Sequence, residues 1–274
     1  MSTALDKLKA AQARRQSILS AGLEPCPQYL FPGMTGDIAG YKACLRSLIS
    51  AAHEHVCAFK LNLAFFEALG RQGWDRLYAV REMIPEDCLV IADAKRSDIG
   101  TSAERYALAI FDHLGADAVT VNPLMGRDSC EPFLRHAHKL TFLLALTSNP
   151  GADDFLLREG FYERVIERSM HWSDAGNIGY VVGATRPEYL ARARQLAGEA
   201  PFLVPGVGAQ GGDAASLAGG LIPNSAFPGL IVHATRALLP TEADAQDPRA
   251  AVATRAGQLR EQLNNALLLP GATG

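Results

Sequence analysis

Short apolar runs alternate with helical patterns along most of the chain. Eight of these runs have the length of buried β-strands, and they lie at 17–23, 56–61, 88–93, 118–121, 141–146, 178–182, 202–204 and 230–232. Between them, apolar residues recur every three or four positions, as at 37–53. This alternation predicts an α/β fold, a (β/α)8 TIM barrel. An open doubly wound sheet is the alternative, but the GxGxxG turn that it would need near its first strand is absent.

Helical patterns fill the intervals between the strands. They lie at 4–16, 37–53, 64–72, 75–83, 102–114, 130–138, 161–172, from Pro187 onwards, and at 249–268. Thr101 or Ser102 is expected to cap the helix at 102–114, after a turn at Gly100. We expect one domain over 1–274, with 1–16 as an extra N-terminal helix, 249–268 as the closing helix and 152–160 as a lid.

Composition narrows the class of protein. The 274 residues carry a formal net charge of −3 and no basic block, which argues against nucleic acid and anionic membranes as partners. No apolar run reaches the ~18 residues of a membrane span, and the N-terminus lacks the apolar core of a signal peptide. The five cysteines show no CxxC pair, and neither they nor the histidines have the spacing of a metal site. We therefore expect a cytoplasmic protein with reduced thiols and no zinc.

Ionisable residues gather where the third strand ends. Asp93, Lys95 and Asp98 follow the apolar run at 89–92. Since side chains alternate between the faces of a strand, Asp93 and Lys95 are expected on one side, with Asp98 in the turn beyond. Two carboxylates around one ammonium keep it charged, an arrangement suited to carbanion chemistry without a metal. A charged surface turn is the alternative, although barrel enzymes hold their reactive groups at this position.

Other strand ends carry further candidates. Lys60 ends the second strand, a glycine-rich loop at 205–212 containing Gln210 follows the seventh, and Arg236 follows the eighth. The loops after strands seven and eight form the usual phosphate site of a TIM barrel, and an arginine can bind phosphate through two parallel hydrogen bonds. The alternatives are a flexible loop that binds nothing and a Lys60 that lies along the barrel rim with its ammonium in water.

At this point the residues resemble a known family. DAKRSDIGTSAERYA, AFKLN, TVNPLMGRDSCEPFL, LTSNPGA, VVGAT and VPGVGAQGG are similar, in order, to segments of the orotidine 5′-phosphate decarboxylases, specifically their longer bacterial (type 2) subfamily. The resemblance spans roughly 22–237. It implies a homodimeric TIM barrel that converts orotidine 5′-monophosphate to uridine 5′-monophosphate and CO2, the last step of UMP biosynthesis, without a metal or another cofactor.

The resemblance also implies catalytic roles. Lys95 resembles the lysine that delivers a proton to C6 after CO2 has left. Asp93 resembles the carboxylate that lies against the substrate carboxylate. Asp98 matches an aspartate that reaches across the dimer interface into the partner's site, and Lys60 matches the lysine that completes the charge network and contacts the ribose.

Binding roles are implied in the same way. Ser102 matches a hydroxyl near the ribose of the neighbouring site, and Ser148 matches a contact to the pyrimidine. Gln210 and Arg236 match the phosphate contacts, and Pro205 lies in a matching substrate-binding segment.

Two positions depart from the family pattern. Glu24 stands in GLEP where the family usually has aspartate in GLDP, so the carboxylate that holds a ribose hydroxyl is one methylene longer. Ser97 stands where glycine is common.

Two other functions stay open. A Mg²⁺-dependent decarboxylase or aldolase of the same superfamily, acting on a sugar phosphate, would want an acidic ligand where this chain has Lys60. A catalytically inactive barrel that only binds a phosphate ligand would have no need of the intact Lys95 and Asp98.

Overall fold

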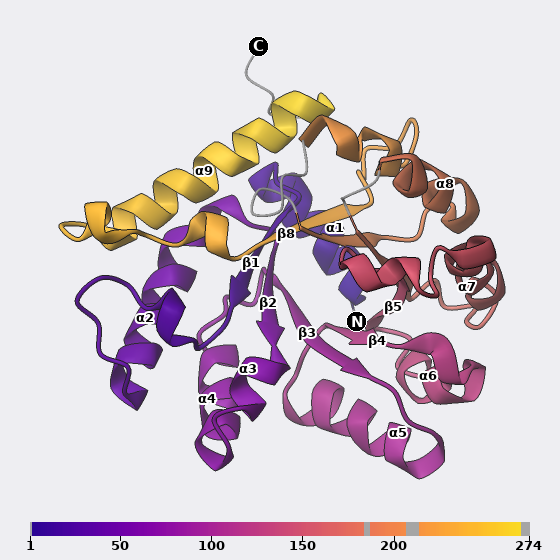
Figure 1. The fold of residues 1–274 in the computed structure, drawn as a ribbon, viewed down its shortest axis with the longest axis horizontal. Coiled ribbons are helices and arrows are strands. Elements are labelled where there is room, and N and C mark those ends of the chain that lie inside the picture. The colour runs from indigo at the N-terminus through magenta and orange to yellow at the C-terminus, as the bar shows by residue number, and fades with distance from the viewer. Residues whose placement is uncertain (1, 184–186, 207–213, 270–274) are drawn as a thin grey trace.

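Eight parallel strands form a closed barrel, surrounded by helices (Figure 1). The structure, a computed structural model, describes residues 2–183, 187–206 and 214–269. The strands pair in chain order and β8 returns to β1, which confirms the predicted TIM barrel. Their bounds are Leu19–Leu23 (β1), Ala58–Asn62 (β2), Leu89–Arg96 (β3), Ala118–Val121 (β4), Leu140–Leu146 (β5), Ile178–Val182 (β6), Phe202–Pro205 (β7) and Leu230–Ala234 (β8).

The α-helices follow the predicted order with some different bounds. They are Ala4–Arg15 (α1), Ile38–Ala52 (α2), Leu63–Glu67 (α3), Arg71–Arg81 (α4), Gly100–Ala107 (α5), Arg127–Leu134 (α6), Phe161–Ser169 (α7), Pro187–Ala197 (α8) and Pro248–Leu267 (α9). Pro187 is the first residue of α8, as predicted. None of these helices is long and apolar enough to cross a bilayer.

Two helix predictions are wrong. A single helix over 64–72 does not form, because α3 ends at Glu67 and Gly70, with a φ of 63°, turns the chain into α4. The helix predicted at 102–114 begins two residues earlier, with Ile99 as its N-cap and no capping bond from Thr101 or Ser102. Its second half, Leu108–His113, is a π-helix.

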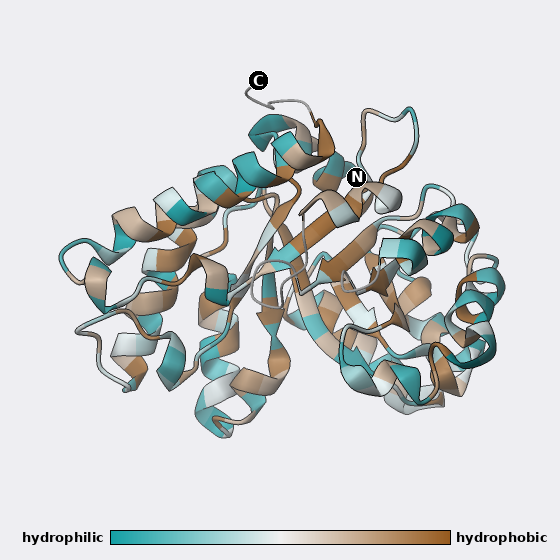
Figure 2. Ribbon diagram, turned by 45° about the horizontal axis from the view of Figure 1, so that its top comes forward, coloured by the Kyte–Doolittle hydropathy of each residue, from teal (hydrophilic) through white to brown (hydrophobic). Residues whose placement is uncertain are grey.

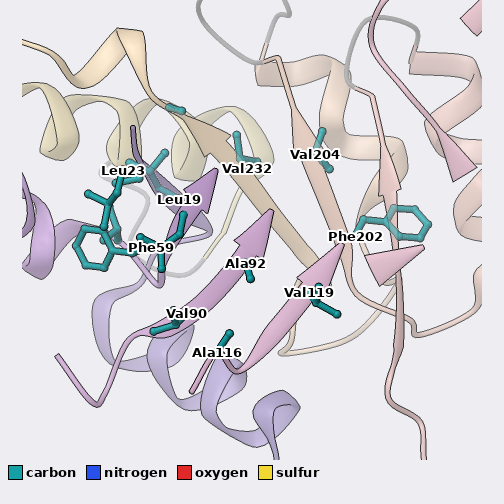
Figure 3. Packing of buried hydrophobic residues seen from close by; sticks show 14 of the residues in the cluster. Leu19, Leu23, Phe59, Val90, Ala92, Ala116, Val119, Phe202, Val204 and Val232 are labelled. Atoms are coloured by element: carbon teal, nitrogen blue, oxygen red, sulfur yellow. The ribbon is translucent and has the colours of Figure 1, made fainter. Parts of the chain in front are cut away.

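Alternation along the strands produces two apolar layers. On β3, Val90 and Ala92 point outward to the layer between strands and helices, part of which Figure 3 shows. Leu89 and Ile91 point inward, to the barrel interior. The strands are accordingly apolar on both faces, whereas the helices present polar residues on their outer surfaces (Figure 2).

Helix α1 closes the N-terminal end of the barrel and lies behind the strands in Figure 1. Its Leu8 and Ala11 are buried against the apolar residues of the barrel interior. The Gln12 amide Nε2 donates to the backbone oxygen of Leu230 at 2.7 Å. Since this end is covered, the carboxyl ends of the strands form the face on which a ligand can enter.

A bulge interrupts the pairing of β3 with β4. Ala92 pairs with Val119 and Arg96 with Val121, so β3 uses four residue steps where β4 uses two. Within the bulge, Lys95 has a φ of 46°, in the left-handed region that is uncommon for residues other than glycine. Strand β3 was expected to end at Asp93, and it continues to Arg96 because pairing resumes beyond the bulge.

Candidate active site

Asp93 lies between two lysine ammonium groups at the carboxyl ends of the strands. Its Oδ2 accepts from Lys60 Nζ on β2 at 2.6 Å, and its Oδ1 accepts from Lys95 Nζ at 2.5 Å. Inward-facing positions bring them together, since Lys60 follows Ala58 and Asp93 follows Ile91 at a spacing of two. The structure therefore confirms that Lys60, Asp93 and Lys95 lie together.

Burial and charge oppose each other at Asp93. Burial by itself would raise the pKa of the Asp93 carboxyl, but the ammonium groups of Lys60 and Lys95 outweigh it and hold that pKa well below its usual range. Lys60 is buried with its partner, whereas the Lys95 side chain is 52% exposed. The site thus holds a fixed negative charge beside a lysine that solvent can reach.

A threonine on the neighbouring strand completes this network. The Thr120 hydroxyl donates to Asp93 Oδ1 at 3.0 Å and accepts from the backbone N–H of Lys95 at 3.0 Å. Thr120 is only 1% exposed, and it faces inward on β4 opposite the bulge. Asp93 therefore accepts hydrogen bonds from side chains of three adjacent strands.

These groups form one side of a cavity of about 230 Å³ at the mouth of the barrel. Its lining is charged on the side of β2 and β3 and more apolar on the side of β5 to β7. The lining residues are Lys60, Asp93, Lys95, Thr120, Leu144, Thr147, Ser148, Asn149, Val181, Leu203, Pro205 and His233. Such a cavity suits a small ligand whose reacting atom faces the charged side.

A larger cavity, of about 430 Å³, lies at the opposite end of the barrel, between α1 and α9. Among the described residues that line it, Lys9 alone is ionisable. Although this cavity is larger, its described lining lacks the paired acidic and basic groups that a reaction would need.

Several predicted substrate contacts lie at the same face. Ser148 and Pro205 line the smaller cavity, as their strand-end positions implied. Glu24 is buried at the end of β1, where its Oε1 accepts from Asn62 Nδ2 at 3.4 Å. Arg236 is exposed just after β8. Gln210 lies outside the described residues.

Asp98 and Ser102 do not join the network within this chain. The Asp98 carboxylate accepts from the backbone N–H of Ile99 at 2.8 Å, and Ser102 is exposed on α5. The expected arrangement of two carboxylates around one ammonium is therefore reversed in a single chain: one carboxylate lies between two ammonium groups. The reason is that Asp98 lies beyond the end of β3, where its carboxylate accepts from Ile99, while Lys60 on the neighbouring strand contacts Asp93.

Sequence reasoning missed Thr120 and His233. Both face inward at strand ends, so the alternation that identified Lys60 also applies to them. Burial, assisted by the nearby ammonium of Lys60, holds the pKa of His233 well below its usual value. His233 is therefore neutral at physiological pH and adds no charge to the cavity.

The comparisons with known proteins agree with this geometry. Residues 21–254 match the model of the orotidine 5′-phosphate decarboxylase / HUMPS family. The chain is 41% identical to the orotidine 5′-phosphate decarboxylase of Dehalococcoides mccartyi, over 95% of this chain and 97% of that protein. It is also 41% identical to that of Dechloromonas aromatica, over 96% and 98%. The solved structure of Leishmania donovani OMP decarboxylase superposes with a TM-score of 0.82 at 39% identity, covering 97% of this chain and 99% of that one.

Proposed function

Because the chain belongs to the orotidine 5′-phosphate decarboxylase / HUMPS family, we infer that it converts orotidine 5′-monophosphate to uridine 5′-monophosphate and CO2. This carboxy-lyase reaction completes UMP biosynthesis. The observation that carries the inference is the Lys60–Asp93–Lys95 network at one wall of the cavity. It supplies the two charges that a decarboxylation needs, a cation for the developing carbanion and an anion beside the departing group.

Lys95 is the proposed acid. When the bond between C6 and the carboxyl carbon breaks, its electron pair stays on C6 as an sp² carbanion. The Lys95 ammonium stabilises this charge and then transfers a proton from Nζ to C6, which yields the product. The neutral amine regains a proton from water, to which the half-exposed side chain has access.

Asp93 and Lys60 are proposed to prepare the substrate. Asp93 stays ionised because both ammonium groups depress its pKa, so it places negative charge against the substrate carboxylate. That repulsion disappears when neutral CO2 leaves, which favours the transition state over the bound substrate. Lys60 balances the charge of Asp93 and is proposed to contact the ribose.

The remaining contacts are proposed to provide binding energy. Ser148 and Pro205 would contact the pyrimidine side of the ligand, Glu24 a ribose hydroxyl, and Arg236 with Gln210 the phosphate. The phosphate is far from the bond that breaks, so its binding energy can be used to orient the reacting ring.

A homodimer would place Asp98 and Ser102 in the partner's site. Apolar side chains surround this region: Ile99 is 52% exposed, Leu124 is 56% exposed and Met125 is 49% exposed. The backbone N–H of Asn122 donates to the oxygen of Arg96, which holds the two segments side by side. Exposed apolar groups gathered in this way mark an interaction surface.

A complementation assay tests the dimer. Mixed Lys95→Ala and Asp98→Ala chains should recover about a quarter of wild-type activity, because half the dimers are hybrids with one intact site. No recovery from chains shown to exchange subunits would contradict the shared site.

We also propose a cellular compartment and a subfamily for this enzyme. The five free cysteines, four of them buried, fit a cytoplasmic enzyme, and the motifs favour the longer bacterial (type 2) subfamily. The net charge of −3 favours a small-molecule substrate over nucleic acid or an anionic membrane.

A Mg²⁺-dependent sugar-phosphate reaction is less compatible with the donor set. Lys60 ends β2 where such a reaction needs an acidic ligand, and both carboxylate oxygens of Asp93 already accept hydrogen bonds from lysines. We propose on this chemistry that the decarboxylation needs no metal or other cofactor.

The direct test follows the absorbance of orotidine 5′-monophosphate after purified protein is added in the presence of EDTA. We expect the substrate to disappear with wild-type protein and to persist with Lys95→Ala, because that variant lacks the proton donor. Product binding to Lys95→Ala, measured by calorimetry, should remain detectable. Full activity of this variant would overturn the assignment.

A further inference from the structure

The bulge in β3 leaves its reactive segment without regular pairing to β4. Residues 93–95 have no partner in the β3–β4 register, which passes from Ala92–Val119 directly to Arg96–Val121. Bulges near active sites redirect side chains at the cost of ladder hydrogen bonds. Something other than the β4 backbone must therefore hold Lys95 in its left-handed conformation.

The Thr120 hydroxyl occupies this place. Its oxygen accepts from the backbone N–H of Lys95, and its hydrogen is directed to Asp93 Oδ1. The direction of each bond is fixed, because an ionised carboxylate can only accept and a backbone N–H can only donate. One hydroxyl thus connects the backbone of the proposed acid to the carboxylate beside it.

We propose that Thr120 is a positioning residue that fixes the geometry between Lys95 and Asp93. The inference rests on the proposed decarboxylation and adds to it a residue that the sequence did not indicate. Through the Lys95 N–H, Thr120 keeps the lysine backbone at a φ of 46°, from which Nζ reaches Asp93. Through Oδ1, it fixes the rotation of the Asp93 carboxylate, whose other oxygen is held by Lys60.

The chemistry of the side chain makes this role specific. Valine has nearly the same shape as threonine but has neither a donor nor an acceptor, so Thr120→Val would keep the packing and remove both bonds. Serine keeps the hydroxyl and loses only a methyl group. The two substitutions therefore separate hydrogen bonding from space filling.

Another strand offers a matched control. Thr141 on β5 is fully buried, and its hydroxyl has no hydrogen-bond partner among the described residues. It pairs in register with Val119, next to Thr120. Thr141→Val is thus the same chemical change at a neighbouring buried site that does not contact the lysine network.

The test compares kcat, KM and product binding for these variants. We expect Thr120→Val to lower kcat by at least about 30-fold, since small misplacements of a reacting group are costly, while KM and the Kd for uridine 5′-monophosphate change by less than about 3-fold. Thr120→Ser should stay within about 5-fold of wild type, and Thr141→Val should match wild type. A kcat of Thr120→Val close to that of Thr141→Val would overturn the proposal.

Two further measurements keep the test decisive. If Thr120→Val does not fold, Thr120→Ala and Thr120→Ser both lack the methyl group and differ in the hydroxyl, so equal kcat values for them would overturn the role. A crystal structure of the hydroxyl-free variant should show Lys95 outside the left-handed region, and an unchanged φ with an intact Asp93 contact would contradict the proposal without reference to activity. If the wild-type protein itself does not decarboxylate orotidine 5′-monophosphate, the proposed function is wrong, which is a different outcome from a failure of the Thr120 role.

Discussion

At the scale of single residues, the Asp93 carboxylate is fixed by several hydrogen bonds at once. Donors from three successive strands hold it, namely Lys60, Lys95 and Thr120. The lowered pKa of Asp93 means that the folded state stabilises the ionised carboxylate relative to the unfolded chain. Asp93 therefore adds stability above the ordinary carboxyl pKa, and this contribution is lost as the pH falls through the lower pKa of the folded state.

Lys60→Met tests this balance of charges. Removing one ammonium leaves the effect of burial opposed by Lys95 and the Thr120 hydroxyl alone among the donors described above, so the pKa of Asp93 should rise. We expect kcat/KM to fall by about 100-fold at neutral pH, and its decline in acid to begin at a higher pH than in wild type. Pre-steady-state and steady-state rates between pH 4 and pH 8 measure both effects.

The control is Lys42→Met, at an exposed lysine of α2 outside the cavity. Its pH profile should overlay that of the wild type. A Lys60→Met profile with an unshifted acid limb would mean that Asp93 is not the group whose ionisation the reaction needs.

Part of this site was predictable from the sequence. Alternation along β2 and β3 places Lys60 and Asp93 in the barrel mouth, and the position of both at strand ends identified them. Thr120 follows the same alternation, but a lone threonine within an apolar run has no chemical pattern that distinguishes it from a core residue. Its partner, the Lys95 N–H, becomes available only through a bulge that no local residue pattern indicated.

At the scale of elements, the strands were easier to predict than the helices. The bounds of β4 and β6 match the predicted ranges. Each apolar run begins directly after a polar residue, Asp117 or Asn177, and ends before Asn122 or Gly183.

A break between two helices was predicted in the α3–α4 region, but at 73–74, whereas α3 ends at Glu67 and α4 begins at Arg71. Gly73 explains the sharp turn: a Cβ there would lie 1.7 Å from the Phe66 oxygen, so only glycine lets the two helices approach this closely.

Gly179→Ala tests the same principle inside the barrel. A Cβ at this position of β6 would lie 2.6 Å from the Phe142 ring and 2.7 Å from the Pro201 oxygen. We expect a loss of about 1–3 kcal/mol in the free energy of unfolding, because the packed interior cannot accommodate the methyl group without displacement. Denaturant titration measures it.

Gly36→Ala is the control, since the nearest atom to a Cβ there is 3.9 Å away and Gly36 has no positive φ. Its stability should stay within about 0.5 kcal/mol of wild type. Equal stabilities of the two variants would show that β6 shifts freely to make room.

At the scale of the whole molecule, one end of the barrel is closed by α1 and the other holds the cavity. The closed end depends on residues far apart in the chain, since Leu8 contacts the same interior cluster as Ile231. The alternation of eight strands and their helices predicted the barrel, but the sequence pattern of α1 showed only an amphipathic helix. Where such a helix packs is decided by the tertiary structure.

Leu8→Ala should therefore destabilise the whole barrel. Leu8 is fully buried, and we expect a loss of about 2–5 kcal/mol in the free energy of unfolding, because the substitution removes apolar contacts and leaves a cavity. Leu268→Ala, at a leucine that is 87% exposed, should change stability by less than about 0.5 kcal/mol. A Leu8→Ala variant as stable as Leu268→Ala would mean that α1 is not part of the cooperative unit.

The seam between β1 and β8 has a kinetic consequence. Leu19 pairs with Val232, so the ring cannot close until nearly the whole chain has collapsed. Contacts at such large sequence separation slow folding, and a partly assembled sheet exposes two unpaired edges meanwhile. Refolding yield should accordingly fall as protein concentration rises, since two open edges of different molecules can meet before the edges of one molecule do.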